Sequence, residues 1–118
     1  MNTKSIAIWI TFIFSSTLLS SQLNTIAYAD ANQKLNGLSG IPKTNSNQKP
    51  GVLILPAWMG IGDHAKHTAA QLSDLGYYTF VADIYGEGNY PKNSNEAGER
   101  SGYYKNNADK YISRIQLA

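Results

Sequence analysis

In the middle of the chain the spacing of apolar positions changes from a strand-like run to a helical period and back to a strand-like run. Residues 52–55 (VLIL) form a continuous apolar run, bounded by Pro50-Gly51 and by Pro56. A short run that is apolar on both faces is typical of a central parallel strand covered by helices on each side. Residues 78–82 (YTFVA) form a second run, rich in β-branched and aromatic side chains, and predict a second strand.

Between these two runs the apolar positions follow a helical period. From Ala65 to Leu75 apolar side chains recur every three or four residues, which predicts a helix over residues 63–75 with one apolar stripe. Asp63 is expected to cap the first turn, and Gly76 stands where a C′ glycine belongs. Strand, helix and strand together form a βαβ unit, so the sequence predicts a parallel sheet.

Two further helices are expected after this unit. Residues 83–95 form a loop by composition, and helical patterns follow over residues 96–104 and 107–118, the second with Tyr111, Ile115 and Ala118 on one face. A sheet of two parallel strands leaves both edges and one face uncovered. The remainder of the sheet is therefore expected beyond residue 118, and the fold class expected is a partial α/β fold.

The N-terminal 29 residues have the three-part layout of a secretory signal peptide. Lys4 gives a positive start, residues 6–19 (IAIWITFIFSSTLL) are free of charge, and the small-x-small sequence Ala27-Tyr28-Ala29 precedes Asp30. The apolar run is shorter than the ~20 residues of a membrane-spanning helix. We therefore expect residues 1–29 to be a cleaved signal peptide and the protein to be exported, to the periplasm or the extracellular space.

The composition of the remaining chain argues against several classes of partner and cross-link. Residues 30–50 are rich in Asn, Gln, Lys and Ser and are expected to form a polar tether, with one short edge strand around residues 38–41. From Asp30 onward nine Lys and Arg face eight Asp and Glu, which is too balanced for a nucleic-acid partner. The chain has no cysteine, so neither disulfides nor a lipoprotein anchor are expected.

Ligands of open α/β sheets bind beyond the carboxyl ends of the strands. Residues 56–62 (PAWMGIG) and 83–89 (DIYGEGN) occupy those positions. One hypothesis is a dinucleotide site, because residues 60–65 fit G-x-G-x-x-A and Asp83 stands where a ribose-binding acid is found. Against it, Asp63 would place negative charge where a pyrophosphate binds.

Other side chains near these loops have simpler interpretations. His64 and His67 are spaced to share a metal with Asp63, but two histidines in a polar first turn are more often solvated, and no metal is expected. Asp83 is expected to cap its own loop. On composition alone, Trp58 and Met59 belong in a core. The abundant tyrosines mostly pack as well: Tyr77, Tyr78, Tyr85, Tyr103, Tyr104 and Tyr111.

Residues 50–87 resemble the dienelactone hydrolase family. The likeness lies in the apolar strand, a loop with an aromatic residue and a glycine, Asp-His opening a helix, a Leu-Gly-Tyr helix end, and a strand ending Ala-Asp-Ile-Tyr-Gly. It continues more loosely to Ala118. The resemblance implies an α/β-hydrolase fold and hydrolysis of esters or lactones by a Cys-Asp-His triad without a cofactor. Because this chain holds no cysteine and no G-x-C-x-G turn, the triad is expected after residue 118 and this chain alone is expected to be inactive.

The same resemblance assigns an oxyanion loop to this chain. It implies that the backbone N–H of Trp58 is one oxyanion donor, with Ala57, Met59, Tyr85 and Glu87 lining the pocket. Ala57 departs from the family, whose best-known members have a Glu there that helps to activate the nucleophile. Glu87 stands near the position where such enzymes use an Arg to hold a substrate carboxylate, so this departure points away from an anionic substrate.

Two functions therefore follow from the sequence. The first is an exported ester or lactone hydrolase whose N-terminal half is residues 51–118, acting on a small molecule. The alternative is a non-catalytic exported remnant or binding domain, which should bury a core of its own. The sequence defines no oligomeric state.

Overall fold

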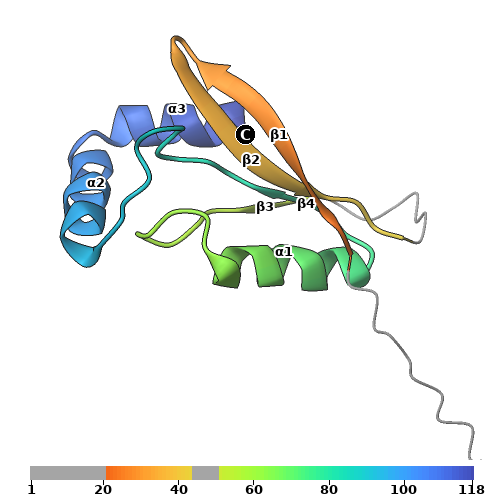
Figure 1. Ribbon diagram of the computed structural model, residues 1–118. Coiled ribbons are helices and arrows are strands. Elements are labelled where there is room, and N and C mark those ends of the chain that lie inside the picture. The colour runs from red at the N-terminus through yellow and green to blue at the C-terminus, as the bar shows by residue number, and fades with distance from the viewer. Residues whose placement is uncertain (1–20, 44–50) are drawn as a thin grey trace, which may run out of the picture.

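The computed structural model describes residues 21–43 and 51–118. These residues form a four-stranded mixed sheet and three helices (Figure 1). The strands run in the order β1-β2-β4-β3, with β3 and β4 parallel and the other pairs antiparallel. The elements are β1 (Leu23–Asp30), β2 (Gln33–Gly40), β3 (Gly51–Ile54), α1 (Asp63–Asp74), β4 (Tyr78–Val81), α2 (Ser94–Asn106) and α3 (Ala108–Leu117).

The βαβ unit predicted from the sequence is present as β3, α1 and β4. Helix α1 ends in a Schellman motif: Tyr77 N–H donates to Leu72 O at 3.0 Å, and Gly76 N–H donates to Ser73 O at 2.9 Å. Gly76 adopts φ 95°, as predicted for a C′ glycine. The predicted cap at Asp63 was wrong, because Gly62 is the N-cap residue and Asp63 is the first residue of the helix.

Strand β3 lies at one edge of the sheet. Its parallel pairing with β4 was predicted, whereas the central position was not found among the described residues. Leu53 and Leu55 are 42% and 43% exposed, so the side chains that made the run look fully buried are only partly covered. Among the described residues no strand pairs with the outer edge of β3, so that edge can accept another strand.

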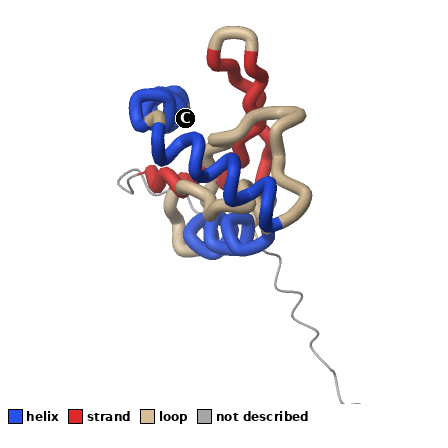
Figure 2. Tube along the Cα trace, turned by 90° about the vertical axis from the view of Figure 1, so that its left-hand side faces the viewer, coloured by secondary structure: helices blue, strands red, loops and turns tan. Residues whose placement is uncertain are grey.

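A β-hairpin replaces the predicted polar tether. Strand β2 is an inner strand that pairs with β1 over eight residues and with β4 over residues 38–40, so it differs from the short edge strand expected around residues 38–41. Residues 23–29, assigned to the signal peptide from the sequence, form most of β1. Residues 1–20 and 44–50 lie outside the described residues. Figure 2 shows the tip of the hairpin standing away from the helices.

Two small cores hold the layers together. Helix α1 packs Ala65 and Ala69 against Val81 of β4, on one face of the sheet. Beyond β4, Ala82, Ile84 and Tyr85 form a second cluster, covered by Tyr104 of α2 and by Tyr111 and Ile115 of α3. The predicted shared face of Tyr111 and Ile115 is thus the face that packs. None of the helices in the described part of the chain is long and apolar enough to cross a membrane.

A glycine in β2 makes the close approach of β2 to α1 and β4 possible. A Cβ added at Gly40 would overlap Ser73 Oγ and Thr79 Oγ1, which share a 3.0 Å hydrogen bond. We expect Gly40→Ala to lower the free energy of unfolding by about 1–3 kcal/mol, because both hydroxyls have to move. Urea unfolding measures the change.

A second glycine provides the matched control. A Cβ at Gly102 of α2 would meet nothing within 4 Å, so Gly102→Ala is expected to raise stability by about 0.5–1 kcal/mol through helix propensity alone. Equal effects of the two substitutions would show that β2 does not approach α1 in this way.

Candidate functional site

The carboxyl ends of the two parallel strands meet at one edge of the sheet. Strand β3 ends at Ile54 and β4 at Val81, and these two residues are paired in register. Ala82 N–H donates to Ile54 O at 3.0 Å, which extends the pairing by one step. The two loops singled out from the sequence therefore start side by side, where α/β folds bind ligands.

The first loop makes a tight turn from Ala57 to Gly60. Gly60 N–H donates to Ala57 O at 2.8 Å, and Gly60 adopts φ 81°, a conformation that suits glycine. Tyr85 Oη donates to Trp58 O at 2.7 Å, which fixes the turn against the second loop. Within the described residues the Trp58 N–H makes no backbone hydrogen bond, so it remains available to a ligand oxygen.

The second loop is organised around one buried carboxylate. Asp83 is 1% exposed and follows β4 directly. Its Oδ1 accepts the Gly86 N–H at 2.9 Å, so the predicted capping role of Asp83 is confirmed. Its Oδ2 accepts the Asn36 N–H at 2.8 Å and the Tyr90 hydroxyl at 2.6 Å. Both carboxylate oxygens are thus directed at protein groups and buried, so Asp83 is not accessible to a ribose.

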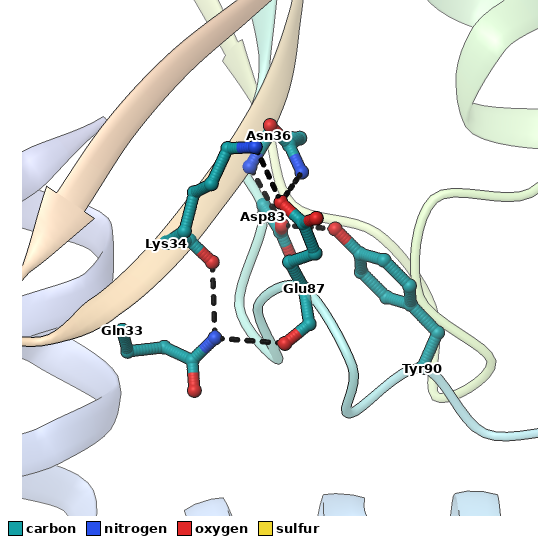
Figure 3. Close-up of polar contacts among 6 residues, drawn as sticks. All are labelled: Gln33, Lys34, Asn36, Asp83, Glu87 and Tyr90. Carbon is teal, nitrogen blue, oxygen red and sulfur yellow. Dashed lines mark hydrogen bonds and ion pairs between the residues drawn. The ribbon is translucent and has the colours of Figure 1, made fainter.

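The β1–β2 hairpin holds the outer part of this loop (Figure 3). Lys34 Nζ lies 2.8 Å from Glu87 Oε2, and Asn36 Nδ2 donates to the same oxygen at 3.1 Å. Gln33 Nε2 donates to the carbonyl oxygens of Lys34 and Glu87, each at 3.0 Å. The Glu87 carboxylate is therefore directed at the hairpin and neutralised there.

The two hollows beside these loops divide the residues proposed for the pocket. One, of about 200 Å³, is lined by Ala57, Trp58 and Tyr85 together with Tyr104 and Tyr111. The other, of about 460 Å³, is lined by residues that include Met59, Glu87, Lys34, Lys66 and Tyr90. The turn at Trp58 and Met59 thus contributes to both hollows, and the predicted lining residues do not share a single one.

Trp58 and Met59 are exposed in the described structure. Their exposed fractions are 49% and 41%, so the interpretation of both as core residues was wrong for the described part of the chain. Of the abundant tyrosines, Tyr85 and Tyr104 pack as expected, whereas Tyr78 and Tyr103 are exposed. The exposed Trp58 and Met59 side chains therefore lie in the loop that follows the carboxyl end of β3.

Burial and hydrogen bonding change the acidity of several groups at the site. Burial raises the pKa of the Tyr85 and Tyr104 phenols above their usual range. Hydrogen bonds from Lys34, and then from Asn36, hold the pKa of Glu87 below its usual range. Glu87 consequently stays ionised around neutral pH and is unsuited to act as a general acid.

The Tyr90 phenol gives the site a pH dependence. Burial, and then the hydrogen bond to Asp83, raise its pKa from 10.0 to about 12. A raised folded-state pKa contributes stability that is complete below the unfolded value and is lost as the pH rises through the folded one. We therefore expect stability to fall between about pH 10 and pH 12, and to fall less steeply in Tyr90→Phe. Urea midpoints across this pH range measure the difference, and exposed Tyr103→Phe is the control. If stability fell equally steeply with pH in Tyr90→Phe and in the unmodified chain, the assignment of this pH dependence to Tyr90 would be wrong.

The histidines contribute no site in the described structure. His64 and His67 are exposed on α1, and the described residues include no group of three side chains that could hold a metal ion. Gly60 and Gly62, the glycines of the dinucleotide hypothesis, immediately precede α1. The exposed Asp63 carboxylate, however, lies in the first turn of that helix, where a pyrophosphate would have to bind.

Sequence reasoning missed the contribution of the hairpin. Gln33, Lys34 and Asn36 all contact the second loop, and Tyr28 Oη accepts the Asp83 N–H at 3.0 Å. These contacts join residues about fifty positions apart, and the hairpin lay in segments assigned to a leader and a tether. The alternation of β2, which buries Leu35 and Gly37, was the signal that was present.

Comparisons with known proteins agree with this geometry. The sequence model of the dienelactone hydrolase family matches residues 35–118. Among solved structures, a dienelactone hydrolase-like promiscuous phosphotriesterase from metagenomic libraries has a TM-score of 0.74 and 24% identity, over 83% of this chain and 41% of that one. A protein named m3DLH gives 0.69 and 24%, over 82% and 42%. The chain thus spans about two fifths of the length of these structures. A search of functionally curated proteins gives no match.

Proposed function

This chain belongs to the dienelactone hydrolase family, and from that membership we propose that it is the N-terminal part of a hydrolase of carboxylic esters or lactones. Its sheet and helices are those of an α/β-hydrolase. The observation that supports the proposal most directly is the turn from Ala57 to Gly60. Among the described residues the Trp58 N–H has no backbone acceptor, and it lies at the carboxyl ends of two parallel strands, where such enzymes form the oxyanion hole.

The proposed reaction is acyl transfer to the thiolate of a cysteine that is expected in the part of the protein after residue 118. Attack of the thiolate on the carbonyl carbon forms a C–S bond and places negative charge on the carbonyl oxygen. The Trp58 N–H donates to that oxygen in the transition state. Collapse expels the alkoxide, which takes a proton from the triad histidine expected beyond residue 118. That histidine then takes a proton from the water that attacks the thioester, which releases the acid and restores the thiolate. No cofactor takes part in the proposed reaction.

The substrate of the proposed hydrolase is uncharged around its acyl group. Glu87 stands near where enzymes of this family use an Arg to hold a substrate carboxylate, and its own charge is paired with Lys34, so this position supplies no Arg to hold a substrate carboxylate. The exposed indole of Trp58 and the rings of Tyr85 and Tyr104 favour an apolar acyl or alcohol group beside the turn. A neutral phosphotriester is a second substrate to test, because one structural neighbour is described as a promiscuous phosphotriesterase.

We further propose that the protein is exported. The support is the sequence of residues 1–20, with Lys4 before an uncharged apolar run. Fractionation of the producing cell tests this proposal, and recovery of the protein in the cytoplasmic fraction alone would overturn it.

The coding sequence downstream of codon 118 gives the first test of the hydrolase. An open frame that reaches a G-x-C-x-G turn is expected, and an immediate stop codon would favour the non-catalytic remnant instead. The second test is hydrolysis of p-nitrophenyl acetate and dihydrocoumarin by the product of that complete frame. Hydrolysis that iodoacetamide abolishes is expected, and its absence from the 118-residue chain is the control.

A further inference from the structure

Strand β1 is an integral part of the sheet. Its eight residues pair in register with β2, from Leu23 opposite Gly40 to Asp30 opposite Gln33. Leu23 also packs against the core cluster beneath α1. Removal of β1 would turn β2 into an eight-residue edge strand with unpaired backbone groups, which folded proteins avoid.

The tyrosine of the small-x-small sequence supports the candidate site. Tyr28 Oη accepts the Asp83 N–H at 3.0 Å, and its ring lies 5.8 Å from that of Phe80 in an edge-on contact. Asp83 in turn holds the second loop through Gly86 and Tyr90. A chain that lacks Tyr28 would lose one of the groups that fix the start of this loop.

Asp30, the last residue of β1, forms an ion pair with Arg114 that a cut after Ala29 would weaken. Asp30 Oδ2 lies 3.0 Å from Arg114 Nε, and Arg114 is only 9% exposed. Arg114 Nη1 is buried and has no hydrogen-bond partner among the described residues. A cut after Ala29 would give Asp30 a positively charged α-amino group, on the same residue that neutralises this guanidinium.

Ser21, the first residue that the structure describes, contacts the end of helix α1. Its N–H and its Oγ both donate to Asp74 Oδ1, at 2.9 and 2.7 Å. Asp74 is the last residue of α1, so Ser21 ties the segment to the helix end. If Ser21 were the first residue, its α-ammonium group would stand beside this carboxylate as a charge-assisted donor.

From these contacts we propose that export processing occurs within the serine-rich segment of residues 15–21, before Ser21, and that Ala27-Tyr28-Ala29 is strand and not a cleavage site. The segment overlaps the end of the uncharged run of residues 6–19 and contains the small residues Ser15, Ser16, Thr17 and Ser20, of which Ser15 and Thr17 have the small-x-small spacing that signal peptidase accepts. The inference rests on the proposed export of the protein and is independent of the hydrolase activity. The mature chain keeps β1 and with it the support of the candidate site.

Intact-mass measurement of the exported protein tests the inference. The gene is expressed with its own leader in a secreting bacterial host, and the first residue is determined on the exported fraction. A first residue between Ser16 and Ser21 is expected. A start at Asp30 would overturn the inference and leave export intact, and a start at Met1 in the exported fraction would overturn it by showing that the leader is retained.

A double variant provides the matched control. Ala27 and Ala29 are exposed on β1, so Ala27→Leu with Ala29→Leu preserves the strand while it removes both small residues that cleavage after Ala29 requires. Processing of this variant is expected to match the unmodified protein in position and extent. Accumulation of unprocessed precursor in the double variant would show that the bond after Ala29 is the one cleaved.

Discussion

Replacement of Trp58 by proline is expected to lower kcat of the proposed hydrolase about 100- to 1000-fold, equivalent to about 2.7–4 kcal/mol of transition-state stabilisation. Proline has no backbone N–H, so the substitution deletes the proposed oxyanion donor itself. Trp58 is the second residue of the turn from Ala57 to Gly60, a position that proline favours in common β-turns, so the turn is expected to persist. Steady-state hydrolysis of p-nitrophenyl acetate by the complete enzyme measures the loss.

The alanine variant separates the backbone from the side chain. Trp58→Ala removes the half-exposed indole and keeps the N–H, so kcat is expected to change far less while KM rises for bulky apolar esters. Comparable losses of kcat in the proline and alanine variants would show that the indole, and not the backbone donor, carries the effect. Equal circular dichroism spectra of the two variants confirm that the fold is retained.

The largest loss of stability is expected for Asp83→Ala. This change leaves the N–H groups of Asn36 and Gly86 and the hydroxyl of Tyr90 without their acceptor at a position that is 1% exposed. Each unsatisfied buried donor costs about 1–3 kcal/mol, so we expect the free energy of unfolding to fall by about 3–5 kcal/mol. Urea unfolding measures the loss.

Two further substitutions give this experiment its controls. Asp83→Asn keeps the shape and one acceptor oxygen, so it is expected to lose less than the alanine variant. Asp109→Ala, in the exposed first turn of α3, is expected to cost no more than about 0.5 kcal/mol. An Asp83→Ala variant as stable as Asp109→Ala would contradict the central place of Asp83.

The parts of the fold that were predictable are those fixed by local patterns. The period of α1, Gly76 after its end and the two apolar runs all act within a few residues, so the βαβ unit and the parallel pairing followed from the sequence. The cap of α1 was misplaced by one residue, because both Gly62 and Asp63 suit that position.

The hairpin was harder to predict because its strands carry few apolar residues. Strand β2 (QKLNGLSG) alternates, but two of its buried positions are glycines on opposite faces: Gly37 admits Phe80 and Gly40 admits Ser73. Such positions look polar and flexible until the neighbouring element is known. The small-x-small sequence also matched a cleavage signal, and this local match competed with the strand.

The candidate site was predictable only in position. The two loops were located from the strand ends, and Asp83 was assigned its capping role. The partners that fix the loops come from β1 and β2, and their identity depends on the sheet order. The division of the lining residues between two hollows likewise depends on the orientation of the turn, which Tyr85 sets.

The uncovered edge of β3 also bears on how this protein is handled during biosynthesis. The N-terminal elements leave the ribosome first, so the β3 backbone and its half-exposed leucines are present before any later strand can pair with them. An open edge of this kind associates with edges of other copies, and association depends on concentration. We therefore expect slow, cool expression to reduce such association.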